Sequence, residues 1–223
     1  MDRSGRGTGA GTGLRRSGEL LSAEIIPVSK LLVVLLAALL VWQFVFRQES
    51  VELGPGVLAA DEPVQANLDP ADSFELEGYR ITPLAEFRIR AKVLSRENYS
   101  MGNESDLSPV DLALGWGRMS DEEVLQDIAI SQSGRWYRWR TQSPPIPRRE
   151  IETHSANMHI IPADENAEDL IGDIRQGQII DLSGLLVRAD ADDGWHWVSS
   201  LTRDDTGARS CELFYVKRVR TIY

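Results

Sequence analysis

The sequence is poor in the residues that most enzymes use for covalent and metal chemistry. Its 223 residues include one cysteine, Cys211, and three histidines. A single cysteine excludes an internal disulfide, so noncovalent packing must hold the fold together. The sequence also contains no P-loop, GxSxG, HExxH or CxxC pattern, which removes the usual signatures of nucleotide-binding, serine-hydrolase, zinc-peptidase and redox sites. We therefore predict no cofactor and no metal site.

One long apolar run interrupts an otherwise polar N-terminal region. Residues 31–46 carry no charge, and with the apolar residues before them the segment 25–46 is 22 residues long. About 20 residues cross the hydrocarbon core of a bilayer. A cleaved signal peptide is the alternative, but bulky aromatic residues end the run where a cleavage site needs small ones. We predict an uncleaved, single-pass transmembrane anchor at 25–46.

The charges on either side of this run predict its orientation. Five basic and three acidic residues precede it, whereas Arg47 is followed by four acidic residues up to Glu62. Because basic flanks remain cytoplasmic, residues 1–24 form the cytoplasmic tail, which its Gly, Ser and Arg content predicts to be disordered. The C-terminal part then lies outside, which in a Gram-negative bacterium means an inner-membrane protein with a periplasmic domain.

The exported part of the chain is strongly acidic. It holds 19 basic and 31 acidic residues, a net charge of -12, compared with -10 for the whole chain. Such a field repels phosphate backbones over a Debye length of about 10 Å at ordinary salt. Nucleic acid is therefore disfavoured as a partner.

Composition divides the exported part into a linker and a folded domain. Residues 47–73 are acidic and punctuated by Gly and Pro, which predicts a linker. From Phe74 to Val93, apolar and polar residues alternate with the period of two that is typical of strands with one wet face. We predict one extracytoplasmic domain over residues 74–223.

Several further elements are predicted within this domain. Capped helices are expected to begin after Ser108 and after Ser120, and a third helix runs from Asp164 towards Gly177. A short helix is expected at 148–154. Alternating or apolar runs predict strands at 135–140, 155–163, 178–189, 195–201 and 211–219.

The order of these elements indicates the fold class. Consecutive strands joined by short turns pair antiparallel, so we predict an α+β protein: a transmembrane helix, then a mostly antiparallel β domain with a few short helices. Gly184 lies in the middle of an expected strand, where glycine lets a sheet coil tightly. A small closed barrel of the OB or SH3 type suits this pattern.

Few residues are candidates for a chemical site. His159 and His196, together with Cys211, could form a catalytic group, although their spacing is typical of no compact metal site. The more common roles are hydrogen-bonded or exposed histidines and a buried thiol on a strand. An intermolecular disulfide is a further alternative for Cys211.

The basic and aromatic stretch at 133–150 offers a candidate binding surface. In a strand over 135–140, alternate side chains share a face. The face with Tyr137 and Trp139 is predicted to point into the core, leaving a small basic outcrop that either pairs with the domain's own acids or meets an anionic partner. Trp116, in a Gly-Trp-Gly joint, is either a core residue or a binding anchor. The candidate binding residues are Trp136, Arg138, Arg140, Arg148, Arg149 and Trp116.

Several segments give the chain a family resemblance. The stretches LSPVDLALGWGRMSD, SQSGRWYRW, SANMHIIPA and SSLTRDDTG followed by CEL resemble an uncharacterised family of bacterial single-pass membrane-anchored proteins. The resemblance covers roughly residues 74–219. It implies a bacterial, extracytoplasmic, single-domain protein, and it implies no activity.

Three functions remain open at this point. The leading one is a membrane-tethered periplasmic module that binds a protein or envelope partner without catalysis. The alternative is a periplasmic hydrolase or transferase that uses a His, Cys or Asp site. A second alternative is an OB-like domain that binds an anionic glycan or oligonucleotide through its arginine-rich strands.

Overall fold

The computed structural model describes residues 32–37, 50–69, 71–202 and 211–223. The chain divides into two units, Met1–Arg47 and Gln48–Tyr223. Residues 32–37 of the predicted anchor are helical, whereas the rest of the anchor and the predicted tail lie outside the described residues. Within the described ranges, no helix is both long and apolar enough to cross a membrane.

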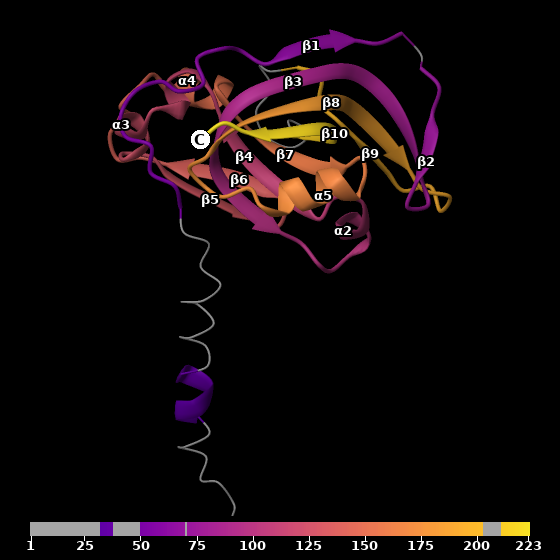
Figure 1. Cartoon of the computed structure of the whole chain (residues 1–223), viewed down its shortest axis with the longest axis horizontal. Coiled ribbons are helices and arrows are strands. Elements are labelled where there is room, and N and C mark those ends of the chain that lie inside the picture. The colour runs from indigo at the N-terminus through magenta and orange to yellow at the C-terminus, as the bar shows by residue number, and fades with distance from the viewer. Residues whose placement is uncertain (1–31, 38–49, 70, 203–210) are drawn as a thin grey trace, which may run out of the picture. The chain divides into compact units, whose positions relative to one another are not determined.

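The larger unit is built mainly from strands (Figure 1). Its strands are β1 (Val64–Asn67), β2 (Phe74–Leu76), β3 (Tyr79–Asn98), β4 (Val110–Gly115), β5 (Ala129–Ser133), β6 (Trp136–Arg140), β7 (Ser155–Pro162), β8 (Ile179–Asp190), β9 (His196–Val198) and β10 (Glu212–Thr221). Its helices are α2 (Asn103–Leu107), the 3-10 helix η1 (Gly117–Ser120), α3 (Glu122–Leu125), α4 (Arg148–Thr153) and α5 (Glu165–Gly172).

Five of these strands close into a barrel. β3 pairs with β4, β4 with β7, β7 with β10 and β10 with β8, and β8 returns to β3. Only the β7–β10 pairing among these five is parallel. β1 and β2 extend the sheet beside β3, β9 pairs with β8, and β5 and β6 form a separate hairpin. The α+β class with a mostly antiparallel sheet is confirmed.

The length of β3 allows this closure. Its residues 80–92 pair with β8 and its residues 92–98 with β4, and its register shifts between Pro83 and Ala85 and again between Val93 and Ser95. Such bulges bend a strand and increase its twist, and proline, which has no N–H to donate, is tolerated at them. The predicted alternation is confirmed here, because Phe87 and its apolar neighbours at every second position are buried.

The barrel interior is the main hydrophobic core, and α5 covers part of it. Asp164 caps this helix as predicted, since its carboxylate accepts the N–H of Ala167 at 2.8 Å. Ala167 and Ile171 belong to the same core cluster as Phe214 of β10. The helix thereby buries one face against the barrel, where it packs on β7 and β10 (Figure 1).

The helix predicted after Ser108 is wrong. Residues 110–115 form β4, which lies between β3 and β7 and is buried at all six positions. A strand that is buried on both faces is mostly apolar and loses the alternation that would reveal it. The helix predicted after Ser120 exists as α3, but Asp121 is its cap, accepting the Glu123 N–H at 3.0 Å.

The structure of the segment 47–73 also differs from the linker that was predicted for it. Residues 64–67 form β1 on the edge of β3, and Ala59 is fully buried. The hydroxyl of Ser120 accepts the N–H groups of Leu58 and Ala59 at 3.2 and 3.0 Å. These backbone hydrogen bonds, the burial of Ala59 and the Glu62 carboxylate, which accepts from Trp116, hold this acidic segment on the domain, although its composition is typical of a linker.

Candidate functional site

A pocket of about 680 Å³ opens on the outer face of the barrel beside β7. Its lining residues come from α2, the β5–β6 hairpin, β7 and the segment between β8 and β10: Glu104, Arg135, Trp136, His159, His196, Trp197, Val198, Ser199, Ser200 and Cys211. His159 points outward because its neighbours Met158 and Ile160 belong to the barrel interior.

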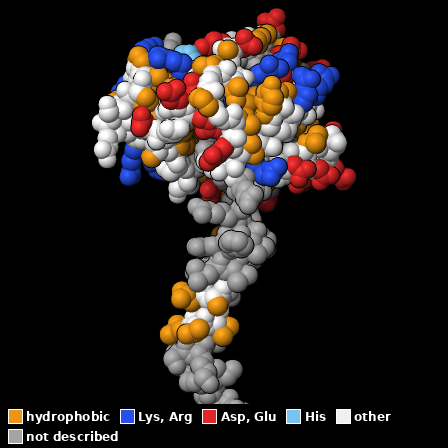
Figure 2. All heavy atoms as spheres, turned by 60° about the vertical axis from the view of Figure 1, so that its left-hand side comes forward, with side chains coloured by type: hydrophobic (Ala, Val, Ile, Leu, Met, Phe, Trp, Pro, Cys, Tyr) orange, Lys and Arg blue, Asp and Glu red, His pale blue; other side chains and the backbone are white. Residues whose placement is uncertain are grey.

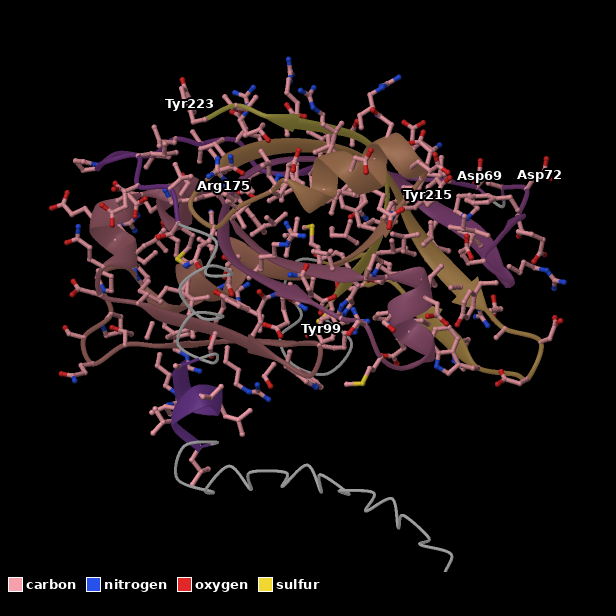
Figure 3. The ribbon with its side chains drawn as sticks, turned by 60° about the horizontal axis from the view of Figure 1, so that its bottom comes forward. Asp69, Asp72, Tyr99, Arg175, Tyr215 and Tyr223 are labelled. Atoms are coloured by element: carbon pink, nitrogen blue, oxygen red, sulfur yellow. The ribbon has the colours of Figure 1, made fainter. Side chains whose placement is uncertain are left out.

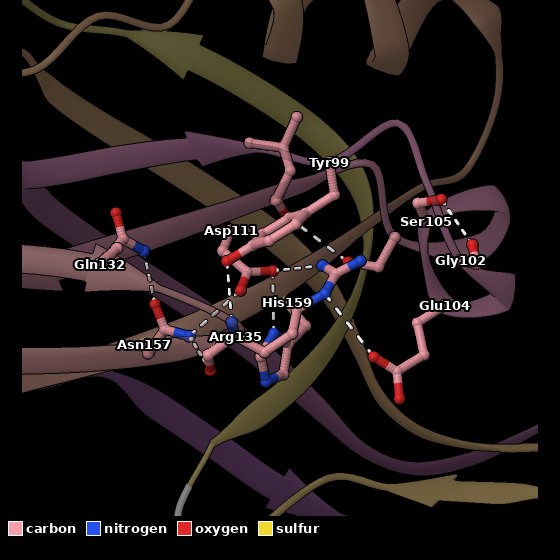
Figure 4. Close-up of polar contacts among 11 residues, drawn as sticks. Tyr99, Gly102, Glu104, Ser105, Asp111, Gln132, Arg135, Asn157 and His159 are labelled. Carbon is pink, nitrogen blue, oxygen red and sulfur yellow. Dashed lines mark hydrogen bonds and ion pairs between the residues drawn. The ribbon is translucent and has the colours of Figure 1, made fainter.

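A buried carboxylate orients the histidine of this pocket. Asp111 of β4 lies directly opposite His159 of β7 in the sheet and is fully buried. Its Oδ1 is 2.9 Å from His159 Nδ1. A carboxylate at Nδ1 favours the tautomer with the proton on that nitrogen, which leaves Nε2 as an acceptor. In Figure 4 the second ring nitrogen points away from Asp111.

Arg135 joins the same carboxylate from the tip of the β5–β6 hairpin. Gly134 and Arg135 form the two-residue turn, with φ angles of 58° and 69°, as a type I′ turn requires. The Arg135 guanidinium donates to Asp111 Oδ1 at 2.7 Å and lies 3.8 Å from Glu104 Oε2. It also stacks 3.7 Å from the ring centre of Tyr99. These contacts offset the unfavourable left-handed backbone of a non-glycine residue.

Further side chains hold this network in place (Figure 4). Asn157 donates to the Arg135 carbonyl at 3.2 Å and to Asp111 Oδ2 at 3.4 Å, and it accepts from Gln132 at 2.6 Å. The Tyr99 hydroxyl accepts the Arg135 N–H at 2.9 Å. Burial raises the pKa of Tyr99, so its hydroxyl stays neutral. The hairpin tip is therefore locked onto β4 and β7.

Aromatic rings form the apolar wall of the pocket. The Trp197 ring lies 4.5 Å from the His159 ring, centre to centre. Trp136 is 41% exposed and lines the same pocket. The site thus combines a flat apolar surface with hydroxyl, imidazole and carboxylate groups.

All three catalytic candidates from the sequence, His159, His196 and Cys211, line this pocket. Leu213 of β10 lies opposite His159 of β7, and this pairing brings Cys211, which directly precedes β10, to the same pocket as His159. Asp111, Asn157 and Tyr99 were not among the candidates. Within the described residues, no group of three or more His, Cys, Asp or Glu side chains could hold a metal ion.

The predicted binding residues are distributed over several places. Trp136 lines the pocket, while Arg138 and Arg140 are exposed on β6, so the face assignment of this strand is confirmed. Arg148 pairs with Glu152 at 2.8 Å, and Arg149 is exposed beside it on α4. Trp116 is 1% exposed and donates to Glu62 at 2.8 Å. Its ring is a core residue and offers no binding surface.

Comparison of the chain with models of protein families, with curated proteins and with solved structures finds no match. The function must therefore be argued from the site itself.

Proposed function

We propose that the domain is an OB-type barrel that binds a ligand in the pocket described above. An OB fold is a five-stranded Greek-key barrel that binds ligands on its second and third strands and on the loops after its first and fourth strands. Counting β3 as the first barrel strand, β4 and β7 are the second and third. The loops concerned carry Glu104 and Trp197, and both residues line the pocket. This coincidence is the observation that carries the proposal.

The charges of the pocket favour an uncharged ligand. Arg135, the one arginine or lysine among the described lining residues, is already paired with Asp111 and Glu104. No surplus positive charge remains for a phosphate or sulfate group, which argues against the anionic glycan or oligonucleotide alternative. The exposed Trp136 ring, the half-buried Trp197 ring and the hydroxyl groups of the lining suit the apolar and polar faces of a sugar ring. A neutral glycan of the cell envelope is the ligand class that we propose.

The proposed location follows from the sequence. The apolar segment at 25–46 would tether the domain to the bacterial inner membrane, and the flanking charges would direct it into the periplasm. A non-catalytic module held at the membrane in this way would bind envelope glycan close to the bilayer.

Calorimetric titration tests this function. The full chain, in a detergent without a sugar headgroup, is titrated with a neutral oligomer of N-acetylglucosamine. We expect measurable binding, and we expect Trp197→Ala to weaken it by about tenfold or more, because loss of a central tryptophan usually costs over 1 kcal/mol. Arg138→Gln is the control and should bind like the wild type. Binding of heparin in preference to the neutral oligomer would contradict the proposal.

A second candidate function, hydrolysis or group transfer, is favoured by the placement of Cys211. This half-buried thiol shares the pocket with His159, whose Nε2 could accept the thiol proton. If this function is correct, iodoacetamide should alkylate Cys211 at neutral pH about tenfold faster than a small thiol, as expected for a thiol of lowered pKa. His159→Gln should remove that acceleration. Labelling at or below the rate of the small thiol would leave only the binding function.

A further inference from the structure

A second polar surface lies on the outer face of the barrel, on β3, β8 and β10. Two rows of side chains cross these three strands. In the first row, Asp181 of β8 lies between Arg90 of β3 and Arg220 of β10. In the second row, Ser183 lies between Arg88 and Arg218. Alternate residues of a strand share a face, so the two rows form one surface.

The carboxylate of the first row, Asp181, is paired with arginines of both rows. Arg88 donates to both oxygens of Asp181, at 3.1 and 2.7 Å, and Arg90 and Arg220 lie 3.8 and 3.6 Å from Asp181 Oδ2. The Arg88 hydrogen bonds lower the pKa of Asp181, which keeps its carboxylate ionised. This carboxylate fixes the arginines while leaving them exposed, since the side chains of Arg88 and Arg220 are 59% and 66% accessible.

The second row borders an open groove of about 390 Å³. Its lining includes Arg88, Ser183, Lys217 and Arg218, together with Glu86. Lys217 lies at a bulge, because the register of β10 against β8 shifts between Val216 and Arg218. The bulge leaves both Lys217 and Arg218 exposed. Glu86 is the one acidic side chain among the described residues of the groove.

The charge of this surface is opposite to that of the domain. Four arginines and Lys217 face Asp181 and Glu86, a surplus of three positive charges in a chain of net charge -10. Figure 2 shows that basic side chains gather in patches on the domain, separated by acidic ones. Arginine and lysine beside a hydroxyl donor are the groups that recognise phosphate oxygens.

We propose that this groove binds a phosphate group, held by Arg88 and Arg218 on either side of the Ser183 hydroxyl and by Lys217. Asp181 is a positioning residue that holds Arg88 in place. The groove is distinct from the pocket that His159 and Trp197 line, because the two share no lining residue. Figure 3 shows Tyr99, which stacks on Arg135 beside the pocket, and Tyr223, two residues after β10, in different parts of the domain. It can be occupied whether or not the pocket binds a glycan.

The thermal unfolding of the full chain in neutral detergent tests this proposal. Ligand binding to the folded state raises the unfolding temperature, and the dependence on concentration gives an apparent Kd. We expect inorganic phosphate to stabilise the protein more than sodium chloride of the same ionic strength. Lys217→Gln combined with Arg218→Gln should weaken phosphate binding by about tenfold or more, because the anion loses two charge-assisted hydrogen bonds.

A matched control removes two charges elsewhere. Arg138→Gln combined with Arg140→Gln changes the net charge equally and should keep the full response to phosphate. Glycerophosphoglycerol, a soluble phospholipid headgroup, is the second probe: tighter binding than inorganic phosphate identifies a lipid source, and weaker binding identifies a free phosphate. Equal stabilisation by phosphate and chloride, or an unchanged response in the groove variant, would overturn the proposal.

Discussion

Asp111→Ala is expected to lower the free energy of unfolding by about 3 kcal/mol, since removing one partner of a buried ion pair strands the other charge. Asp111 is fully buried, and its carboxylate accepts hydrogen bonds from His159, Arg135 and Asn157. The expected loss is at the low end for a buried pair because the Arg135 side chain, 14% exposed at a hairpin tip, can turn towards water. Urea unfolding measures the change.

The same substitution should also release the hairpin. Without the carboxylate, the β5–β6 tip loses its ion pair to β4, and amide exchange in residues 129–140 should accelerate more than elsewhere. Asp127→Ala, at an exposed carboxylate near this hairpin, is the control and should change stability by less than about 0.5 kcal/mol. If the two variants unfold alike, the network around Asp111 has no stabilising role.

The sequence predicted β3 and α5 correctly but predicted a helix where β4 lies. Alternation identified β3, and the cap at Asp164 identified α5, because both elements keep one wet face. β4 has no such face, and its flanking Ser and Pro resemble a helix cap. The local pattern therefore favoured a helix, but this segment forms a strand because both of its edges pair in the sheet, one with β3 and the other with β7.

The candidate site was predicted only in part for a related reason. His159 and Cys211 were considered because of their chemistry, and the strand pairing that brings them to one pocket is long-range. Asp111 gave no signal of a site, because an acid three residues after Ser108 fits the first turn of a capped helix and needs no other explanation there. A charged residue inside an apolar run such as VDLALG was the available signal, because a buried carboxylate requires partners. Arg135 carried no local signal for its ion pair, which joins the hairpin tip to β4.

Gly184→Ala is expected to destabilise the domain by about 3 kcal/mol or more, the upper end for overpacking, because backbone rather than side chain must move. A Cβ at this position would lie 1.9 Å from the carbonyl oxygen of Tyr215. β8 pairs with both β3 and β10 here, so it cannot shift away from one without breaking the other.

Gly172→Ala is the matched control for that substitution. Gly172 ends α5, and a Cβ there meets no atom within 4 Å. Alanine should therefore be neutral or stabilising by up to about 1 kcal/mol, as glycine is the weaker helix former. Comparing the urea midpoints of the two variants separates steric closure of the barrel from the general effect of replacing glycine. Equal midpoints would mean that β8 and β10 can separate locally, and the close approach at Gly184 would then not be needed for the barrel to close.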